Sequence, residues 1–384
     1  MGAQPHGVGA RHPLTMRIAV VGCGVFGLGC AIALRERGHE VTVFERGPIP
    51  HPRAASTDVS RTIQRLYGDR HDYIALVQAA EPVWRRWQAE SRVNFYLPIG
   101  HVFLASGQDR GTRAGDSMRS LGLAPIPVAE ARARFPQFAI PEDATVFFDD
   151  WGGYLVSADA VSAMANLAEG LGVIFREDGG VGTIDERTSG VDLGVGDRTL
   201  RFDLAVVATG AWLPTLLPVF RDSIAVTRQC VAFFDPVPGS EHLPGALPVF
   251  AIDSGPDRWY GHPLRDGRIK IADNDLGAIV DPDDAPEVPT AFADSARAFV
   301  GRWMPGLAEG RYAGSRACLY ANTPDNDFIV DLAPGHRRVF VAGGGGGHGF
   351  KFGAIVGEIA ADRIEGRDHP LGERFRLGAR LSPP

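Results

Sequence analysis

Several features that mark particular protein classes are missing from this 384-residue chain. Its four cysteines are too few and too scattered for a disulfide framework or a zinc site. No apolar run approaches the ~18 residues that span a bilayer. The hydrolase, metalloprotease and redox motifs G-x-S-x-G, H-E-x-x-H and C-x-x-C do not occur. The sequence therefore gives no support for hydrolase or metal chemistry, and we predict a protein without a metal or a membrane anchor.

Charge of one sign is not concentrated anywhere in the chain. The formal net charge of −7 gives no electrostatic reason to expect a nucleic-acid partner.

The first residues are rich in Gly, Pro and His and lack the apolar core of a secretion signal, so we predict a disordered leader over 1–15. Free cysteines fit a reducing compartment. We expect a cytoplasmic monomer or weak oligomer.

The chain opens with a strand, a helix and a second strand. Arg17–Val21 is a short apolar β-rich run, and a helical pattern from about Val25 to Arg37 follows a glycine turn. Glu40–Phe44 is the next strand and completes a βαβ unit. The sequence thus predicts a Rossmann-type parallel sheet that begins at the N-terminus.

Further strands and helices are spread along the chain. Buried-strand patterns recur at Gly172–Phe175, Leu204–Gly210 and Arg338–Gly343, and helical patterns at Asp72–Gln88, Ala158–Leu171 and Ala354–Glu365. Other strand patterns indicate an antiparallel sheet: Phe95–Ala105, Thr145–Phe148, Val226–Phe234, Trp259–His262 and Arg268–Ala272. Two interleaved domains fit this distribution better than two consecutive ones.

A G-x-G-x-x-G motif lies between the first strand and the first helix. Its glycines allow a tight turn, a close approach of a pyrophosphate to the helix N-terminus and close packing of the helix on the sheet. Glu45 ends the second strand, where a carboxylate can accept hydrogen bonds from a ribose and would repel a 2′-phosphate, which disfavours NADP. We assign these residues to cofactor binding: Gly22, Gly24, Val25, Phe26, Gly27, Glu45 and Arg46.

The fingerprint alone does not separate FAD from NAD, and two later segments favour FAD. Ala208-Thr209-Gly210 follows a late strand, as in two-domain flavoproteins, which adds Gly210 to the cofactor-binding residues. The glycine run before the last helix, Gly343–Gly349, would aim a helix N-terminus at the flavin and stabilise its anionic reduced ring.

Three stretches resemble a known family. Ile18–Gly27 is similar to the start of the D-amino-acid-oxidase-like flavoproteins. Ala317-Cys318-Leu319-Tyr320 with the following Asn322–Asp331, and Gly347-His348-Gly349-Phe350-Lys351-Phe352, resemble more narrowly the monomeric sarcosine oxidase and N-methyl-amino-acid oxidase family. The resemblance runs from Met16 to about Glu365.

The resemblance implies a set of site residues and a domain division. Cys318 would carry FAD covalently, with Arg316 nearby to lower the pKa of its thiol. Lys270 would lie over the flavin and serve oxygen reduction, and Lys351 would hold the substrate carboxylate. The remaining implied residues are Tyr260 and Tyr320 in the substrate pocket, Ser60 and Arg61 facing the flavin, and Gly347, His348 and Gly349 in the late loop. The fold implied is α/β, a Rossmann-type FAD-binding domain (16–90, 150–215 and 311–384) interleaved with an antiparallel-sheet α+β substrate domain (91–149 and 216–310).

Two residues depart from the family pattern. Gln64 stands where a second carboxylate-binding arginine is expected, with Arg65 beside it, and Asn274 stands where a histidine is expected. We predict an amine oxidase that converts the C–N bond of a secondary-amine or N-methyl amino acid to an imine and reduces oxygen to hydrogen peroxide. The alternatives are a dehydrogenase of the same fold with another electron acceptor, and a non-catalytic FAD-binding subunit.

Overall fold

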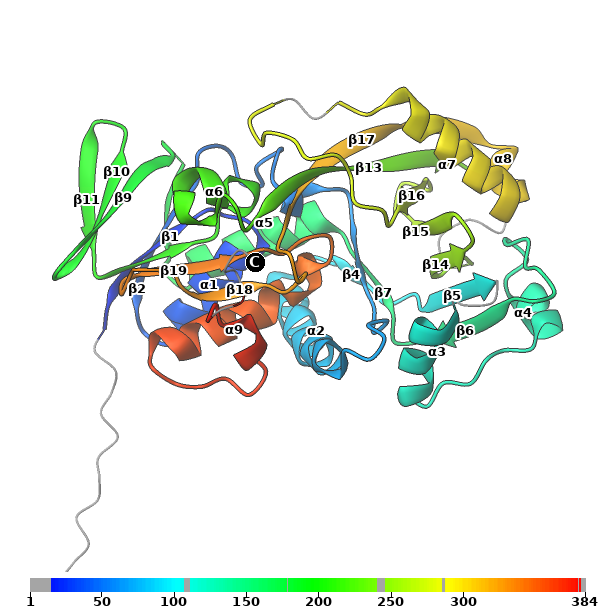
Figure 1. Cartoon of the computed structure of the whole chain (residues 1–384), viewed down its shortest axis with the longest axis horizontal. Coiled ribbons are helices and arrows are strands. Elements are labelled where there is room, and N and C mark those ends of the chain that lie inside the picture. Colours follow the sequence, from blue (N-terminus) through cyan, green and yellow to red (C-terminus); the bar gives the residue numbers. More distant parts are fainter. Residues whose placement is uncertain are drawn as a thin grey trace, which may run out of the picture.

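The computed structural model describes residues 15–106, 111–177, 179–239, 246–284, 287–378 and 380. Of the predicted disordered leader, only Thr15 falls within this part, so that prediction lies outside the described residues. Among the described helices, none combines the length and the apolar character that crossing a bilayer requires. Figure 1 shows two main β-layers side by side, with the cofactor fingerprint of the sequence in the left-hand one.

The first layer is a six-stranded sheet with the strand order β18-β19-β12-β1-β2-β8. Its strands pair in parallel except β18, which runs antiparallel to β19. β1 is buried at four of its five positions, as expected for a strand covered on both faces. The strands are β1 (Arg17–Val21), β2 (Glu40–Phe44), β8 (Ile174–Arg176), β12 (Leu204–Val207), β18 (Ile329–Leu332) and β19 (Val339–Gly343).

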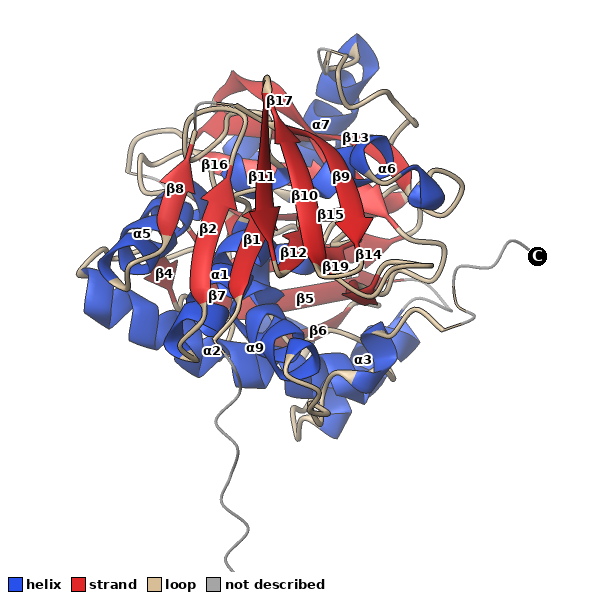
Figure 2. Ribbon diagram, turned by 90° about the vertical axis from the view of Figure 1, so that its left-hand side faces the viewer, coloured by secondary structure: helices blue, strands red, loops and turns tan. Residues whose placement is uncertain are grey.

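Helices cover one face of this sheet and a small antiparallel sheet covers the other (Figure 2). The helices are α1 (Val25–Glu36), α2 (His71–Ser91), α5 (Ser157–Gly170) and α9 (Gly353–Ile364), and the small sheet is β9 (Val181–Arg187), β10 (Gly190–Val195) and β11 (Arg198–Phe202). α1 and α9 cross closely, because a Cβ on Gly29 would lie 2.1 Å from the Gly353 carbonyl oxygen. This close crossing fixes both helix N-termini at the same edge of the sheet.

The second layer is a seven-stranded sheet with the order β17-β13-β16-β15-β14-β5-β6. Its pairs are antiparallel except β14 and β5. The strands are β5 (His101–Ser106), β6 (Thr145–Asp149), β13 (Ala225–Asp235), β14 (Val249–Ser254), β15 (Asp257–Pro263), β16 (Ile269–Asp273) and β17 (Arg311–Asn322). α4 (Val128–Arg134), α7 (Thr290–Trp303) and α8 (Pro305–Ala308) pack on one face, while α3 (Gly111–Ser120) contacts β5 and β6.

Short elements join the two layers. β3 (Arg61–Ile63), β7 (Gly153–Leu155) and β4 (Tyr96–Leu97) form a three-stranded antiparallel sheet, and α6 (Leu213–Leu216) follows β12. The predicted single strand Phe95–Ala105 is wrong. It is divided into β4 and β5, because the chain turns at Gly100, whose φ of +79° favours glycine.

The α/β fold with a Rossmann-type layer and a mainly antiparallel layer is confirmed. The six-stranded sheet takes its strands from 17–44, 174–176, 204–207 and 329–343, and the seven-stranded sheet from 101–149, 225–273 and 311–322. β17, which we assigned to the cofactor domain, lies at the edge of the seven-stranded sheet. The exact domain limits stay a prediction.

Candidate cofactor groove and active site

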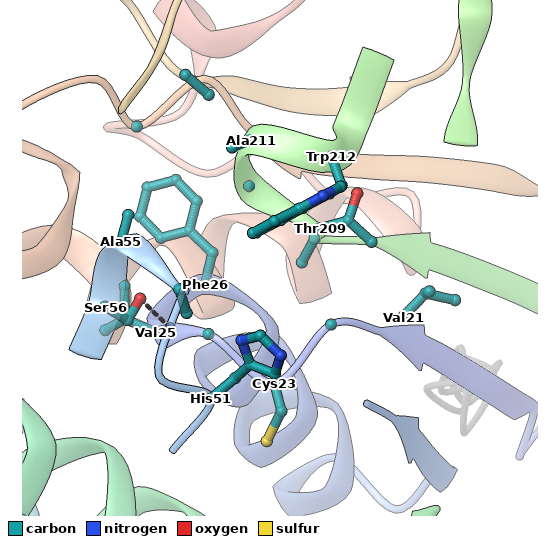
Figure 3. Close-up of a pocket in the computed structure, with 18 of the residues that line it drawn as sticks. Val21, Cys23, Val25, Phe26, His51, Ala55, Ser56, Thr209, Ala211 and Trp212 are labelled. Carbon is teal, nitrogen blue, oxygen red and sulfur yellow. Dashed lines mark hydrogen bonds between the residues drawn. The ribbon is translucent and has the colours of Figure 1, made fainter. Parts of the chain in front are cut away.

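A groove opens where the parallel strands of the first layer end. The turn after β1, the end of β2, the turn after β12 and the glycine run after β19 line it. Figure 3 shows that Val21, Cys23, Val25 and Phe26 approach it from the first βα unit, and Thr209, Ala211 and Trp212 from the segment after β12. This is the edge at which open α/β sheets bind ligands.

The glycine turn has the shape that a dinucleotide requires. Gly22 has a φ of +102°, and a Cβ on it would lie 2.5 Å from the Ala208 carbonyl oxygen. A Cβ on Gly27 would lie 2.0 Å from the Gly22 carbonyl oxygen. Side chains at either position would push α1 away from the turn, so these glycines keep the helix N-terminus and its free N–H groups at the groove.

Polar groups around the glycine turn lie where they can contact the parts of a dinucleotide beyond its pyrophosphate. The Glu45 carboxylate accepts hydrogen bonds from the Cys23 and Arg46 backbone N–H groups, both at 2.9 Å, which fixes it at the groove. The Arg46 guanidinium stacks on the Trp212 ring, 3.9 Å from its centroid. The Thr209 hydroxyl is buried at the groove without a partner in the described residues. The glycine cradle, the carboxylate and the unpaired hydroxyl fit FAD.

The glycine run after β19 leads from this groove to a second cavity. Gly344 and Gly346 have positive φ, and a Cβ on Gly347 would lie 2.8 Å from the Tyr320 ring. Gly347, Arg61 and Tyr320 line both cavities, so the two adjoin. Gly210, with a φ of +55°, and Gly349 line the groove alone, and the second cavity brings together these predicted residues: Ser60, Arg61, Gln64, Tyr260, Lys270, Tyr320, His348 and Lys351.

Lys351 is a buried side chain that forms no ion pair within the described part of the chain. Its ammonium donates to the Tyr67 hydroxyl at 3.0 Å and to the His348 carbonyl at 3.3 Å. None of its hydrogen-bond partners in the described ranges is a carboxylate. Burial, and then the charge of Arg61, lowers the pKa of Lys351 to about 7. An anion entering the cavity would stabilise the charged form, so this side chain can hold a substrate carboxylate.

His348 braces the loop around Lys351. Its Nε2 lies 3.2 Å from the Asn326 carbonyl oxygen, which can only accept, so Nε2 carries the proton. Nδ1 then accepts from the Tyr67 hydroxyl at 3.5 Å. Burial and the charge of Lys351 lower the pKa of His348 to about 3, so the ring is neutral. A chain of hydrogen bonds therefore runs from Lys351 through Tyr67 to His348.

Lys270 lies in the cavity wall beside a carboxylate that our sequence analysis overlooked. It forms buried ion pairs with Asp58, which also pairs with Arg61. Lys270 donates a further hydrogen bond to the Ser60 carbonyl at 2.8 Å, and the Ser60 hydroxyl lies 2.7 Å from Nε2 of His262. The predicted flavin-facing residues Ser60 and Arg61 and the predicted Lys270 thus form one cluster.

The two residues that depart from the family pattern both line the second cavity. The Gln64 side-chain oxygen accepts from the Leu66 backbone N–H, which leaves the amide NH₂ as its donor toward the cavity. Arg65 forms a two-bonded ion pair with the buried Asp149, at 2.5 and 2.9 Å. It is therefore committed to that carboxylate, and it does not replace the second carboxylate-binding arginine of the family pattern in this structure. Asn274 donates its backbone N–H to the Arg258 carbonyl at 2.7 Å.

Cys318 is buried on β17, opposite Gln229 of β13. Burial raises the pKa of its thiol, and the neighbouring Arg61 and Lys270 act in the opposite direction. Arg316, which we expected to lower this pKa, donates instead to the Pro52 carbonyl at 3.1 Å. The cation next to the thiol is Arg61. Tyr260 lies in the same cluster, and burial raises the pKa of its hydroxyl to about 12, so it is neutral.

Sequence reasoning missed Asp58, Tyr67 and His101, which also line or support this site. No motif distinguished them: Asp58 and Tyr67 stand in a polar segment, and His101 begins an apolar run that reads as a strand. One signal was present and was not used. Lys270 and Lys351 are the only two lysines among 39 Lys and Arg residues, and both are buried in the second cavity.

Comparisons with known proteins place the chain in a family. Residues 17–363 match the family described as FAD dependent oxidoreductase. The chain is 25% identical over 358 residues to N-methyl-L-tryptophan oxidase of Citrobacter koseri. The aligned region covers 91% of this chain and 95% of that protein. It is 26% identical over 366 residues to the enzyme of the same name from Yersinia pestis, covering 92% and 96%.

Solved structures agree on the fold. L-proline dehydrogenase from P. horikoshii superposes with a TM-score of 0.83 at 20% identity, covering 95% of this chain and 97% of that one. Fructosamine oxidase from Aspergillus fumigatus superposes with a TM-score of 0.79 at 21% identity, covering 96% and 90%. With the groove and its glycine cradle, the match over 17–363 shows that this chain belongs to the FAD-dependent oxidoreductase family and that FAD is its cofactor.

Proposed function

We propose that the protein oxidises the C–N bond of a small secondary-amine or N-methyl amino acid. The observation that carries the proposal is Lys351, an unpaired buried cation in a cavity that adjoins the cofactor groove. Relatives that match nearly the whole chain are named N-methyl-L-tryptophan oxidase, which supports an N-methyl amino acid as the substrate class.

The residues of the second cavity would bind and orient the substrate. Lys351 would hold the carboxylate, and the Gln64 amide would offer a neutral donor in place of a second cation. Tyr260 and Tyr320 would enclose the amine from the seven-stranded sheet. Bound FAD would accept the hydride equivalent from the C–H bond next to nitrogen. The resulting imine would hydrolyse in water.

We propose oxygen as the electron acceptor. Oxygen takes up two electrons and two protons to become hydrogen peroxide, and negative charge builds on it before the protons arrive. Lys270 supplies a fixed cation in the cavity wall that would stabilise this charge. A dehydrogenase with another acceptor would be favoured if substrate-reduced protein stayed reduced in air.

Anaerobic bleaching of the flavin absorbance by a panel of amines tests the proposal. The panel holds sarcosine, N-methyl-L-tryptophan, other N-methyl amino acids, proline, pipecolate, glycine and D-amino acids. We expect N-methyl or cyclic secondary amino acids to bleach the flavin, and air to restore the colour with release of peroxide. If dithionite bleaches the flavin and no amine does, the proposal is wrong and a non-catalytic FAD-binding protein becomes the better reading.

We also propose that FAD is attached through Cys318. Burial raises the pKa of the thiol and Asp58 raises it further, while Arg61 and Lys270 lower it and so favour the thiolate needed for bond formation. Acid-precipitated protein should keep its yellow colour, and the Cys318→Ala pellet should lose it completely. Cys230→Ala, on the neighbouring strand β13, is the matched control and should keep the colour. Release of flavin from the acid-treated parent protein would contradict the attachment.

The cytoplasmic location and the monomeric or weakly oligomeric state stay predictions.

A further inference from the structure

The carboxylate of Asp58 is fully enclosed and pairs with Arg61, which lines both cavities. Its Oδ2 accepts from both the Lys270 ammonium and the Arg61 guanidinium, and its Oδ1 accepts from the Val59 backbone N–H at 2.8 Å. The Asp58 and Lys270 side chains are 0% and 1% exposed. The Ser157 hydroxyl on α5 donates to the Asp58 carbonyl oxygen, which ties this loop to the first layer. Asp58 is therefore held in place from several sides.

The hydrogen bonds of Lys270 depend on its proton. Two of its N–H groups are used by Asp58 and by the Ser60 carbonyl. A protonated amine has a third N–H, and no acceptor for it occurs among the described residues. Because Lys270 lines the second cavity, this N–H is available to a molecule there. A neutral Lys270 would offer a lone pair instead, so its protonation decides whether the cavity meets a cationic donor or a neutral acceptor.

Burial and Arg61 oppose the charge of Lys270, and Asp58 is the main group that favours it. Burial lowers the pKa of Lys270 most, Asp58 raises it through its charge and its hydrogen bond, Arg61 lowers it, and Cys318 makes the smallest contribution and raises it. His262 on β15 is neutral, because burial and Lys270 hold its pKa well below the ordinary value. The thiol of Cys318 on β17 is also neutral, because burial raises its pKa. Among the described residues, the carboxylate that forms an ion pair with Lys270 is Asp58.

We propose that Asp58 is a positioning residue whose carboxylate keeps Lys270 protonated and directed at the second cavity. The use of a cation at Lys270 for oxygen reduction rests on the proposed function. The protonation state of Lys270 can be measured without any substrate, so this proposal and the proposed function can be contradicted separately. The residue type at position 270 is consistent with a need for Asp58. The chain uses arginine at 37 of its 39 Lys and Arg positions, and an arginine would stay charged without a carboxylate beside it, whereas a buried lysine would not.

The two lysines allow a direct measurement on the FAD-loaded protein. Labelling with lysine carrying ¹³C at the ε carbon gives NMR signals from Lys270 and Lys351 alone, and Lys351→Arg assigns them. We expect Asp58→Asn to lower the pKa read from the Lys270 signal by about 1–3 units. Asp58→Ser, which is smaller and keeps an oxygen for the Val59 N–H, serves if the Asn variant does not hold FAD.

The matched control is Asp159→Asn on α5, which removes an equal charge from an exposed ion pair between Asp159 and Arg265. It should leave the Lys270 titration unchanged. A carboxylate that only braced the loop would give the parent titration in Asp58→Asn, and this result would overturn the proposal. An equal shift in Asp159→Asn would overturn it as well.

A second readout follows the reaction of oxygen with protein reduced by dithionite, which needs no amine. In Asp58→Asn the rate should fall as pH rises through the lowered Lys270 pKa, by about tenfold or more once the proton is lost. Adding Lys270→Arg to Asp58→Asn should make the rate independent of pH, because arginine stays protonated. A loss of rate that is the same at every pH in Asp58→Asn would contradict the proposal.

Discussion

Lys351→Met should raise the KM for the amino-acid substrate by about two orders of magnitude. Removing one member of a buried charge pair typically costs about 2–5 kcal/mol, because the other charge is left without a partner. In this cavity the charge left alone would be the substrate carboxylate, since Gln64 is neutral and Arg65 is committed to Asp149. Methionine keeps the volume and flexibility of the lysine chain, so the cavity should keep its shape.

The same ammonium should make binding sensitive to pH. With a pKa of about 7 in the free protein, Lys351 loses its proton as the pH rises above 7. The dissociation constant of a carboxylate ligand should therefore rise about tenfold for each pH unit above that value. A flavin-difference titration with a non-reacting carboxylic acid at pH 6–9 measures this directly.

Lys351→Arg is the matched control, because arginine stays charged throughout this range. Its ligand affinity should be independent of pH between 7 and 9, and that of Lys351→Met should be weak and flat. If Lys351→Met bound carboxylates as well as the parent protein, the anion would have to be held by another cation of the cavity wall, such as Arg61, which shares the Asp58 carboxylate with Lys270.

Much of the first layer could be predicted from the sequence. Strands that are buried on both faces read as continuous apolar runs, and the glycine turn marks the place where α1 begins. The second layer was harder. β17 was missed because its positions from Tyr312 to Ala317 are all partly buried and show no alternation. The pairing that defines it is with β13, 76 to 97 residues earlier in the chain. Such long-range pairing leaves little local signal.

The site residues also differ in how well the sequence predicts them. Residues carried by a motif, such as Glu45 after β2 and Lys351 in the late loop, lie where the pattern placed them. Asp58 and Tyr67 were missed, because their importance comes from what they contact. Asp58 meets Lys270 from 212 positions away, and Tyr67 meets Lys351 from 284 positions away. Only the packing of the two layers brings these partners together.

Gly27→Val should give a folded protein that does not retain FAD. A Cβ at this position would lie 2.0 Å from the Gly22 carbonyl oxygen, a backbone atom of the turn itself. Relief requires α1 to move outward, which takes its N–H groups away from the pyrophosphate. Overpacking of this kind costs about 1–3 kcal/mol or more, so FAD affinity should fall by at least about fivefold and by up to about 150-fold.

Gly301→Val is the matched control, because nothing lies within 4 Å of a Cβ at that position in α7. It introduces the same side chain into a helix of the second layer and should keep the parent ratio of 450 nm to 280 nm absorbance. Circular dichroism should show the same helix content in both variants. A Gly27→Val protein with full flavin content would mean that the cofactor does not depend on the close approach of α1 to the turn after β1, and the groove would have to bind FAD through the Glu45 and glycine-run ends alone.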